Sequence, residues 1–150
     1  SYVNKMIVYY LGEQPILNQV ETFLCEDKVH RQHVIENISK LVVKPANASG
    51  GYGIMIGPKA PKKEREEVIK KIKKNPRDFV AQPLEILSTT PTISENGIEP
   101  RHLDLRPFVL NGKSTYVTTG GLTRVALRKG STIVNSSQGG GSKDTMVVDT

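Results

Sequence analysis

The stretch around which the chain is organised is LVVKPANASGGYGIMIG, residues 41–57. An apolar run at 41–43 ends in Lys44, a small and polar segment with three glycines follows, and a second apolar run occupies 54–56. Short apolar runs on either side of a glycine-rich segment are typical of a β-hairpin. The pattern therefore predicts two antiparallel strands joined by a glycine-rich loop, with a lysine at the mouth of the loop.

This loop suits a phosphate chain. Glycines let backbone N–H groups approach anionic oxygens closely, and the Lys44 ammonium adds a positive charge. A mobile loop with a solvated lysine has the same sequence features, so the residues alone leave both interpretations open. The two commonest nucleotide motifs do not apply, because no Gly-Lys-Ser/Thr follows the glycines and Gly51-Tyr52-Gly53 leads into β-branched residues rather than into a helix.

Length and composition indicate one domain with a real core, or two small lobes that share one, since 37% of the 150 residues are hydrophobic. No run approaches the ~20 apolar residues of a membrane span. The N-terminus also lacks the basic segment followed by an apolar segment that is typical of an export signal. The single cysteine, Cys25, excludes an internal disulfide framework. We predict a cytoplasmic protein without membrane attachment. The start at Ser1 and the end at Thr150 are those expected of a fragment of a longer protein.

The net charge of +6 indicates anionic partners. Much of the positive charge lies in one predicted helix that begins at Pro61 and ends at Asn75-Pro76, with an apolar stripe along one side. Its lysines are Lys62, Lys63, Lys70, Lys71, Lys73 and Lys74. We interpret them as a solvated face in preference to a nucleic-acid patch. A content of 5% aromatic residues also argues against a base-stacking platform.

Two further helices are predicted before the hairpin. Apolar residues recur at helical spacing over residues 3–11, and Gly12 supplies a stop. Asp27 is a suitable N-cap for the second helix, which follows a short alternating strand at 20–24. His30 and His33 would share a face of that helix. With one cysteine as the only soft ligand nearby, we favour solvated or hydrogen-bonded histidines over a metal site.

Strand signals dominate after the hairpin. FVAQPLEIL (79–87) predicts a strand interrupted at Pro83, which marks a sheet edge or a hinge. Asn96-Gly97 predicts a hairpin, and alternation in RHLDLRPFVL (101–110) places Asp104 and Arg106 on one face of a strand. Gly120-Gly121 predicts a break in the returning strand. A short apolar strand is expected at 132–134, ending at Asn135, and a flexible segment at 136–143.

These features form a set that could hold ATP with magnesium. Lys44 and Arg106 can neutralise phosphate oxygens, while a carboxylate at 104 and an amide at 135 offer the hard oxygen ligands that magnesium prefers. A strand interrupted by proline leaves backbone groups free to read an adenine edge. Each feature also has a simpler explanation: Asp104 with Arg106 could be a surface ion pair, and Asn135 could only shape a turn.

Several long strings in this order resemble the circularly permuted ATP-grasp proteins, which are related to ligases of the glutathionylspermidine synthetase and glutathione synthetase type. The strings are VVKPANASGGYG, FVAQPLE, RHLDLRPFVL, GGLTRVAL and VNSSQGGGSKDTMV. The resemblance covers nearly the whole chain. It implies an α+β fold of ATP-grasp lobes, an antiparallel sheet with flanking helices, as part of a larger permuted protein. Residues 1–40 would be a connecting segment, in one compact unit with a nucleotide-binding core at 41–150.

The resemblance also implies a chemistry, the ATP-dependent joining of a carboxylate to an amine or thiol through an acyl phosphate. Lys44 resembles the lysine that contacts ATP phosphate. The covering loop corresponds to Ser49, Gly50, Gly51, Tyr52 and Gly53. The hinge segment at the adenine corresponds to Gln82, Pro83 and Leu84. The implied partners are ATP, a small carboxylate with an amine or peptide-like substrate, and the remaining segment of the full-length protein.

Arg106 resembles the arginine that meets the phosphates and the acyl-phosphate charge, and Asn135 the asparagine that binds magnesium. Asp104 would be a metal ligand or the partner that orients Arg106. The match departs from the family pattern at Ile133, where an acidic metal ligand is often found, and a second phosphate-contacting lysine has no counterpart. A non-catalytic nucleotide-binding module, or a basic nucleic-acid-binding domain, is the alternative function.

Overall fold

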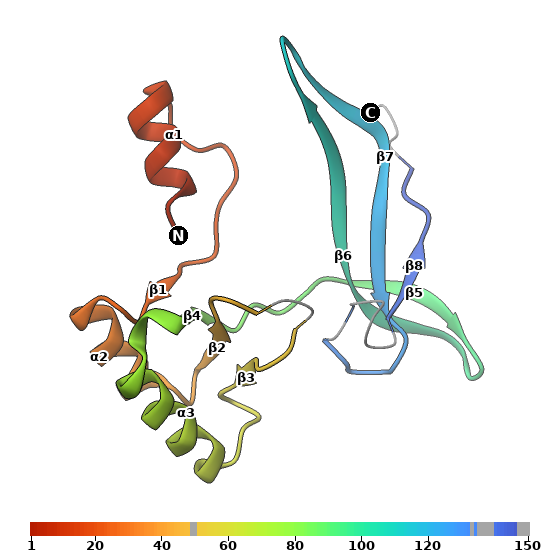
Figure 1. The fold of residues 1–150 in the computed structure, drawn as a ribbon. Coiled ribbons are helices and arrows are strands. Elements are labelled where there is room, and N and C mark those ends of the chain that lie inside the picture. Colours follow the sequence, from red (N-terminus) through yellow and green to blue (C-terminus); the bar gives the residue numbers. More distant parts are fainter. Residues whose placement is uncertain (49–50, 133, 135–139, 147–150) are drawn as a thin grey trace. The chain divides into compact units, whose positions relative to one another are not determined.

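The computed structural model describes residues 1–48, 51–132, 134 and 140–146. The chain divides into two compact units, Ser1–Glu85 and Ile86–Thr150. The fold is mixed α+β: the described residues form two antiparallel four-stranded sheets, one in each unit, and three α-helices, all in the first unit. Figure 1 follows the elements along the chain.

The first unit contains the predicted hairpin within a sheet of order β1-β4-β2-β3. Its strands are β1 (Phe23–Leu24), β2 (Leu41–Pro45), β3 (Met55–Ile56) and β4 (Phe79–Pro83). Val42 pairs with Ile56, and Val43 pairs with Met55, so the antiparallel hairpin is confirmed. Pro83 was predicted at a sheet edge or a hinge; β4 lies between β1 and β2, but at Pro83 it pairs only with Leu41 of β2. Pro83 is the last residue of β4, where no further ladder donor is required.

The core of this unit lies between the sheet and two helices, α2 (Lys28–Asn37) and α3 (Lys62–Lys74), which Figure 1 shows beside the strands. Helix residues Val34 and Ile72 are fully buried against strand residues Val43 and Ala81. Successive side chains of a strand point to opposite faces. Lys44 therefore points to the face of the sheet opposite that of Val43.

The helix boundaries follow the local signals. Asp27 accepts hydrogen bonds from the N–H groups of Val29 and His30, which confirms it as the N-cap of α2. Helix α1 (Val3–Leu11) ends at Gly12, whose φ of 67° is the left-handed conformation that glycine adopts readily. Helix α3 is followed by a short 3-10 helix, η1 (Pro76–Asp78). All six lysines of α3 are exposed, as the prediction of a solvated face requires.

The second unit is a sheet of order β5-β6-β7-β8. Its strands are β5 (Thr89–Ser94), β6 (Gly97–Asn111), β7 (Thr115–Ala126) and β8 (Gly140–Lys143). The predicted hairpin at Asn96-Gly97 is confirmed, since Ser94 pairs with Gly97. Strands β6 and β7 form the long hairpin that Figure 1 shows, with a register shift between Pro107 and Val109.

Three expectations for this unit are wrong. Gly120-Gly121 does not break the returning strand, because β7 runs through both glycines and the register shift absorbs the extra residues. A Cβ on Gly121 would lie 2.9 Å from the Arg106 carbonyl oxygen, so glycine permits a close approach of the two strands. The segment expected to be flexible includes β8, whose Gly141 pairs with Val125. Thr132 and Val134 are not in a strand, while Ile133 and Asn135 lie outside the described residues.

Candidate functional site

Three polar side chains of the first unit, two on neighbouring strands and one just before β1, form a hydrogen-bonded chain, here called the Lys44 relay. The Lys44 ammonium donates to Gln82 Oε1, and Gln82 Nε2 donates to Thr22 Oγ1 at 2.8 Å. The Thr22 hydroxyl in turn donates to the carbonyl oxygen of Val20 at 3.1 Å. The sheet thus brings together two of the sequence-predicted residues, Lys44 and Gln82, and adds a third, Thr22.

Strand register explains why these residues meet. Val42 lies opposite Gln82, and Lys44 lies opposite Val80, so Lys44 is two residues along its strand from the partner of Gln82 and on the same face. On the other side of β4, Phe23 lies opposite Ala81, which places Thr22 next to Gln82. A long lysine side chain can reach a diagonal neighbour in a sheet. All three relay residues are half-buried.

The relay leaves Lys44 able to bind an anion. An ammonium has three donors, and the only hydrogen bond found for it among the described residues is the one to Gln82. A neutral amide oxygen does not cancel its charge, so a phosphate oxygen would be a stronger partner. The Gln82 amide is oriented from both ends, because its oxygen accepts from Lys44 and its nitrogen donates to Thr22.

The predicted covering loop is described only in part, since Ser49 and Gly50 lie outside the described residues. Gly51 and Gly53 have positive φ angles of 82° and 73°, which explains the need for glycine at both positions. Between them, Tyr52 is 70% exposed. After Gln82, Pro83 ends β4 and the half-buried Leu84 belongs to no strand, so the predicted hinge segment leaves the sheet there.

In the second unit, Asp104 on β6 is paired with Arg124, the residue directly opposite on β7. Arg124 Nε donates to Asp104 Oδ1 at 2.8 Å, and a second guanidinium nitrogen donates to Oδ2. These hydrogen bonds lower the pKa of Asp104 and raise the pKa of Arg124. The alternative in which Asp104 forms an ion pair with Arg106 is therefore wrong: the carboxylate binds a cross-strand arginine instead of the one two residues along its own strand.

Arg106 remains available to a ligand. Its side chain is exposed, and it makes no hydrogen bond or salt bridge within the ranges that the structure describes. Its charge adds to the lowering of the Asp104 pKa, after the larger contribution of Arg124. An exposed guanidinium presents five donors in a planar fork, a geometry that matches phosphate oxygens.

The histidines of α2 serve the fold. His30 accepts a hydrogen bond at Nδ1 from the N–H of Leu24 at 3.2 Å, and both His30 and His33 pack against the Phe23 ring. Burial raises the pKa of the Cys25 thiol to about 11, which disfavours the thiolate that a metal needs. No cluster of three or more His, Cys, Asp or Glu residues suited to a metal occurs in the described part of the chain. Neither unit, over those same residues, contains a helix long and apolar enough to cross a membrane.

The family model for circularly permuted ATP-grasp proteins of type 2 matches residues 1–126. The chain belongs to this ATP-grasp family. An uncharacterised protein of Synechocystis is 53% identical over 149 residues, which are 99% of this chain and 31% of that protein. An uncharacterised protein of Mycobacterium tuberculosis is 52% identical, over 99% of this chain and 27% of its own length.

A third relative, from Frankia casuarinae, carries the name "Putative glutamate–cysteine ligase 2-2". It is 48% identical over 98% of this chain, which corresponds to 17% of that protein. The chain thus spans less than a third of the length of these relatives. In each of them, the greater part of the polypeptide lies outside the matched region.

Two residues of the ATP-grasp chain were missed as site residues by reasoning from the sequence, Thr22 and Arg124. Thr22 falls in the alternating strand predicted at 20–24, and Arg124 is the only charged residue in the stretch 122–127. Each acquires its partner across a sheet, Gln82 in one case and Asp104 in the other. Arg124 could have been recognised in the sequence as the single charged residue of an apolar stretch, because such a charge needs an opposite charge nearby.

Proposed function

We propose that this chain is the ATP-binding part of an ATP-dependent ligase that joins a carboxylate to an amine or thiol through an acyl phosphate. Membership of the ATP-grasp family and the ligase name of the Frankia relative support the proposal. The observation that carries it is the Lys44 relay, which holds a cation and an oriented amide on the sheet face opposite the helices. The longer polypeptide would complete the carboxylate and amine pockets.

In this proposal, Lys44 binds phosphate oxygens and residues 49–53 cover them. The segment Gln82–Leu84 would contact the adenine through backbone groups that are free after β4 ends. Arg106 would bind the transferred phosphoryl group and stabilise charge that develops in the transition state. No side chain acts as a nucleophile, because the substrate carboxylate attacks the phosphorus. Catalysis then consists of positioning and charge neutralisation.

Magnesium is the expected metal, and Asp104 with Asn135 would hold it. A carboxylate has about four acceptor sites, so Asp104 can accept two hydrogen bonds from Arg124 and still bind a hard cation. Arg124 orients the Asp104 carboxylate and lowers its pKa, while its positive charge competes with a cation for the same oxygens. When bound, magnesium supplies charge neutralisation between phosphate oxygens.

The test is a calorimetric titration of the chain with Mg-ATP. We expect saturable binding by the wild-type chain and a loss of at least about tenfold in affinity for Lys44→Ala, since a charge-assisted hydrogen bond contributes about 1.5–3 kcal/mol. Lys40→Ala is the matched control, because Lys40 is exposed and lies just before β2. Equal binding by both variants would contradict the role of Lys44.

A second measurement separates a ligase from a non-catalytic nucleotide-binding module. Magnesium-dependent phosphate release by the longer protein, measured while carboxylates and amines are supplied together, would identify the ligase. Binding of Mg-ATP without such turnover would leave the module as the function. A salt-sensitive shift of DNA or RNA by the chain, removed by changing Lys70 and Lys74, would instead favour the basic nucleic-acid-binding domain.

A further inference from the structure

The N-terminal residues form an exposed apolar surface. Helix α1 has nine residues and none of them is buried. The exposed large side chains of this segment, here called the N-terminal surface, are Tyr2, Val3, Met6, Val8, Tyr9, Tyr10, Leu11, Ile16 and Leu17. Helices this short are marginal in water, and most of their stability in proteins comes from packing an apolar face. The apolar side chains of the N-terminal surface therefore lack a packing partner among the described residues.

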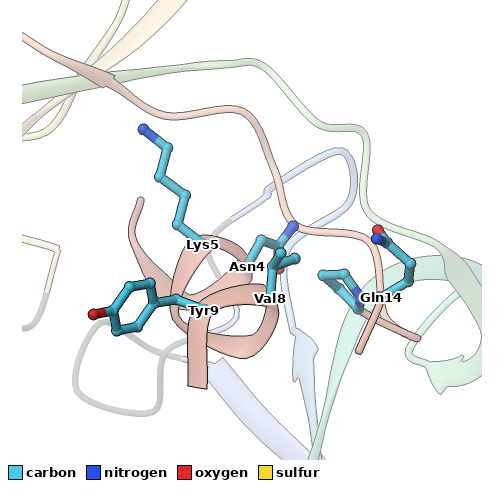
Figure 2. A pocket seen from close by; sticks show the side chains of 6 residues that line it. Asn4, Lys5, Val8, Tyr9 and Gln14 are labelled. Atoms are coloured by element: carbon cyan, nitrogen blue, oxygen red, sulfur yellow. The ribbon is translucent and has the colours of Figure 1, made fainter. Parts of the chain in front are cut away.

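The N-terminal surface is also hollowed. An open hollow of about 570 Å³ is lined by Asn4, Val8, Gln14 and their neighbours. Figure 2 shows the Asn4 and Val8 side chains directed toward the segment that carries Gln14, whereas Lys5 and Tyr9 point away from it. A second hollow of about 510 Å³ is lined mainly by apolar residues, among them Ile7 and Leu17. Both hollows are large enough to receive side chains of a covering segment.

One atom in this surface lacks a hydrogen-bond partner. Asn4 Oδ1 is shielded from solvent, and no described residue donates to it. A shielded oxygen that accepts no hydrogen bond costs about 1–3 kcal/mol, and nearly all such groups in folded proteins are satisfied. A donor from a covering segment would satisfy this oxygen. A covering segment would thus bring an N–H or O–H group as well as apolar side chains.

We infer that the N-terminal surface is covered, in the longer protein, by polypeptide from outside these 150 residues. The Synechocystis relative matches 99% of this chain, yet more than two thirds of that protein lies beyond the match. Helix α1 has a single charged side chain, Lys5, which is too little basic charge for attraction to an anionic lipid surface. An apolar protein segment with one hydrogen-bond donor fits the surface better. The inference does not depend on the proposed ligase function.

The experiment compares hydrogen exchange of the α1 amides in this chain and in the longer protein that contains it. We expect the amides of residues 6–11 to exchange at least tenfold more slowly in the longer protein. Equal exchange rates would overturn the inference. Protection of the chain alone that increases with its concentration would also overturn it, because that result would assign the surface to a second copy.

Two variants make the test specific. Val8→Asp should restore fast exchange of α1 in the longer protein, whereas Ile93→Asp should not, because Ile93 is equally apolar and 87% exposed in the other unit. Asn4→Ala should act differently in the two proteins. Removal of the unpaired oxygen should leave exchange of the chain alone unchanged or slower, and should speed exchange in the longer protein. Faster exchange in both proteins would indicate only a local role in α1 and would overturn the inference.

Discussion

Arg124 holds Asp104 by both carboxylate oxygens and so joins β7 to β6 at two directly opposed residues. Both side chains are mostly buried, at 16% and 28% exposure, so this pair is less screened by solvent than a surface ion pair. The pairing has two consequences. It links the two strands of the β6–β7 hairpin, and it leaves Arg106, two residues from Asp104, without a carboxylate partner among the described residues.

Removal of Arg124 should destabilise the second unit. Arg124→Ala leaves the Asp104 carboxylate without its charged donors, and we expect the free energy of unfolding to fall by about 1–3 kcal/mol. Arg124→Lys should recover only part of this loss, because an ammonium cannot reproduce the two-pronged geometry. Urea unfolding followed by the NMR signals of β6 measures the effect. Equal stability of wild type and Arg124→Ala would show that the pair contributes nothing.

Arg106→Ala should affect activity and leave the fold intact. The side chain is exposed and makes no hydrogen bond in the described part of the chain, so its loss should disturb the fold little. If Arg106 stabilises the transferred phosphoryl group, ATP turnover by the longer protein should fall by ~100- to 1000-fold. Arg128→Ala is the matched control, an exposed arginine of the same unit. Near-normal turnover by Arg106→Ala would refute the assignment.

Thr22→Val tests whether the Lys44 relay matters for nucleotide binding. Valine keeps the shape of threonine but cannot accept the hydrogen bond from Gln82 Nε2, so the amide loses its orientation. A net hydrogen bond contributes about 0.5–1.5 kcal/mol, so we expect Mg-ATP affinity to fall by about two- to tenfold in a calorimetric titration. Thr22→Ser keeps the hydroxyl and should bind nearly as wild type. An equal loss of Mg-ATP affinity in both variants would show that side-chain packing, and not the hydrogen bond, explains the effect.

Glu99 should make the second unit sensitive to acid. Lys129, Arg101 and Ser94 all donate to its carboxylate and lower its pKa from 4.5 to about 2. Because the pKa is lower in the folded chain, the stabilisation is complete above about pH 4.5 and disappears as the pH falls toward 2.

The measurement is the urea midpoint between pH 2 and 6 for wild type and Glu99→Gln. The difference between the two proteins should be largest near pH 6 and shrink on acidification. Glu95→Gln, at an exposed turn position, should follow the wild-type curve. A difference that does not change with pH would show that the charge of Glu99 is not what stabilises the sheet.

Gly57→Ala should destabilise the first unit through a backbone collision. A Cβ at this position would meet the carbonyl oxygens of Ile38 and Leu41, the latter at 2.6 Å, and Gly57 N–H donates to that same Leu41 oxygen. Overpacking of this kind typically costs about 1–3 kcal/mol, and backbone neighbours yield little. Gly112→Ala is the control, since a Cβ there would meet nothing. Similar thermal midpoints for both variants would contradict this account.

Structural features that depend on residues close together in the sequence could be predicted from the sequence alone. The Asp27 cap, the Gly12 stop and the Asn96-Gly97 turn depend on backbone geometry and local hydrogen bonds, and all three are confirmed. The break at Gly120-Gly121 was predicted by the same local reasoning and is wrong. A close approach to Arg106 on the neighbouring strand selects glycine at 121, and only the strand pairing reveals that requirement.

The sequence by itself determined the three helices, the hairpin at 41–57 and the family, because each depends on residue types at fixed spacing along the chain. The tertiary structure decided which polar side chains meet. Thr22 joins Gln82 across 60 residues, and Arg124 takes Asp104 in place of Arg106. Strand order and register create these pairs, and a shift of one residue in either sheet would turn the same side chains to the opposite face.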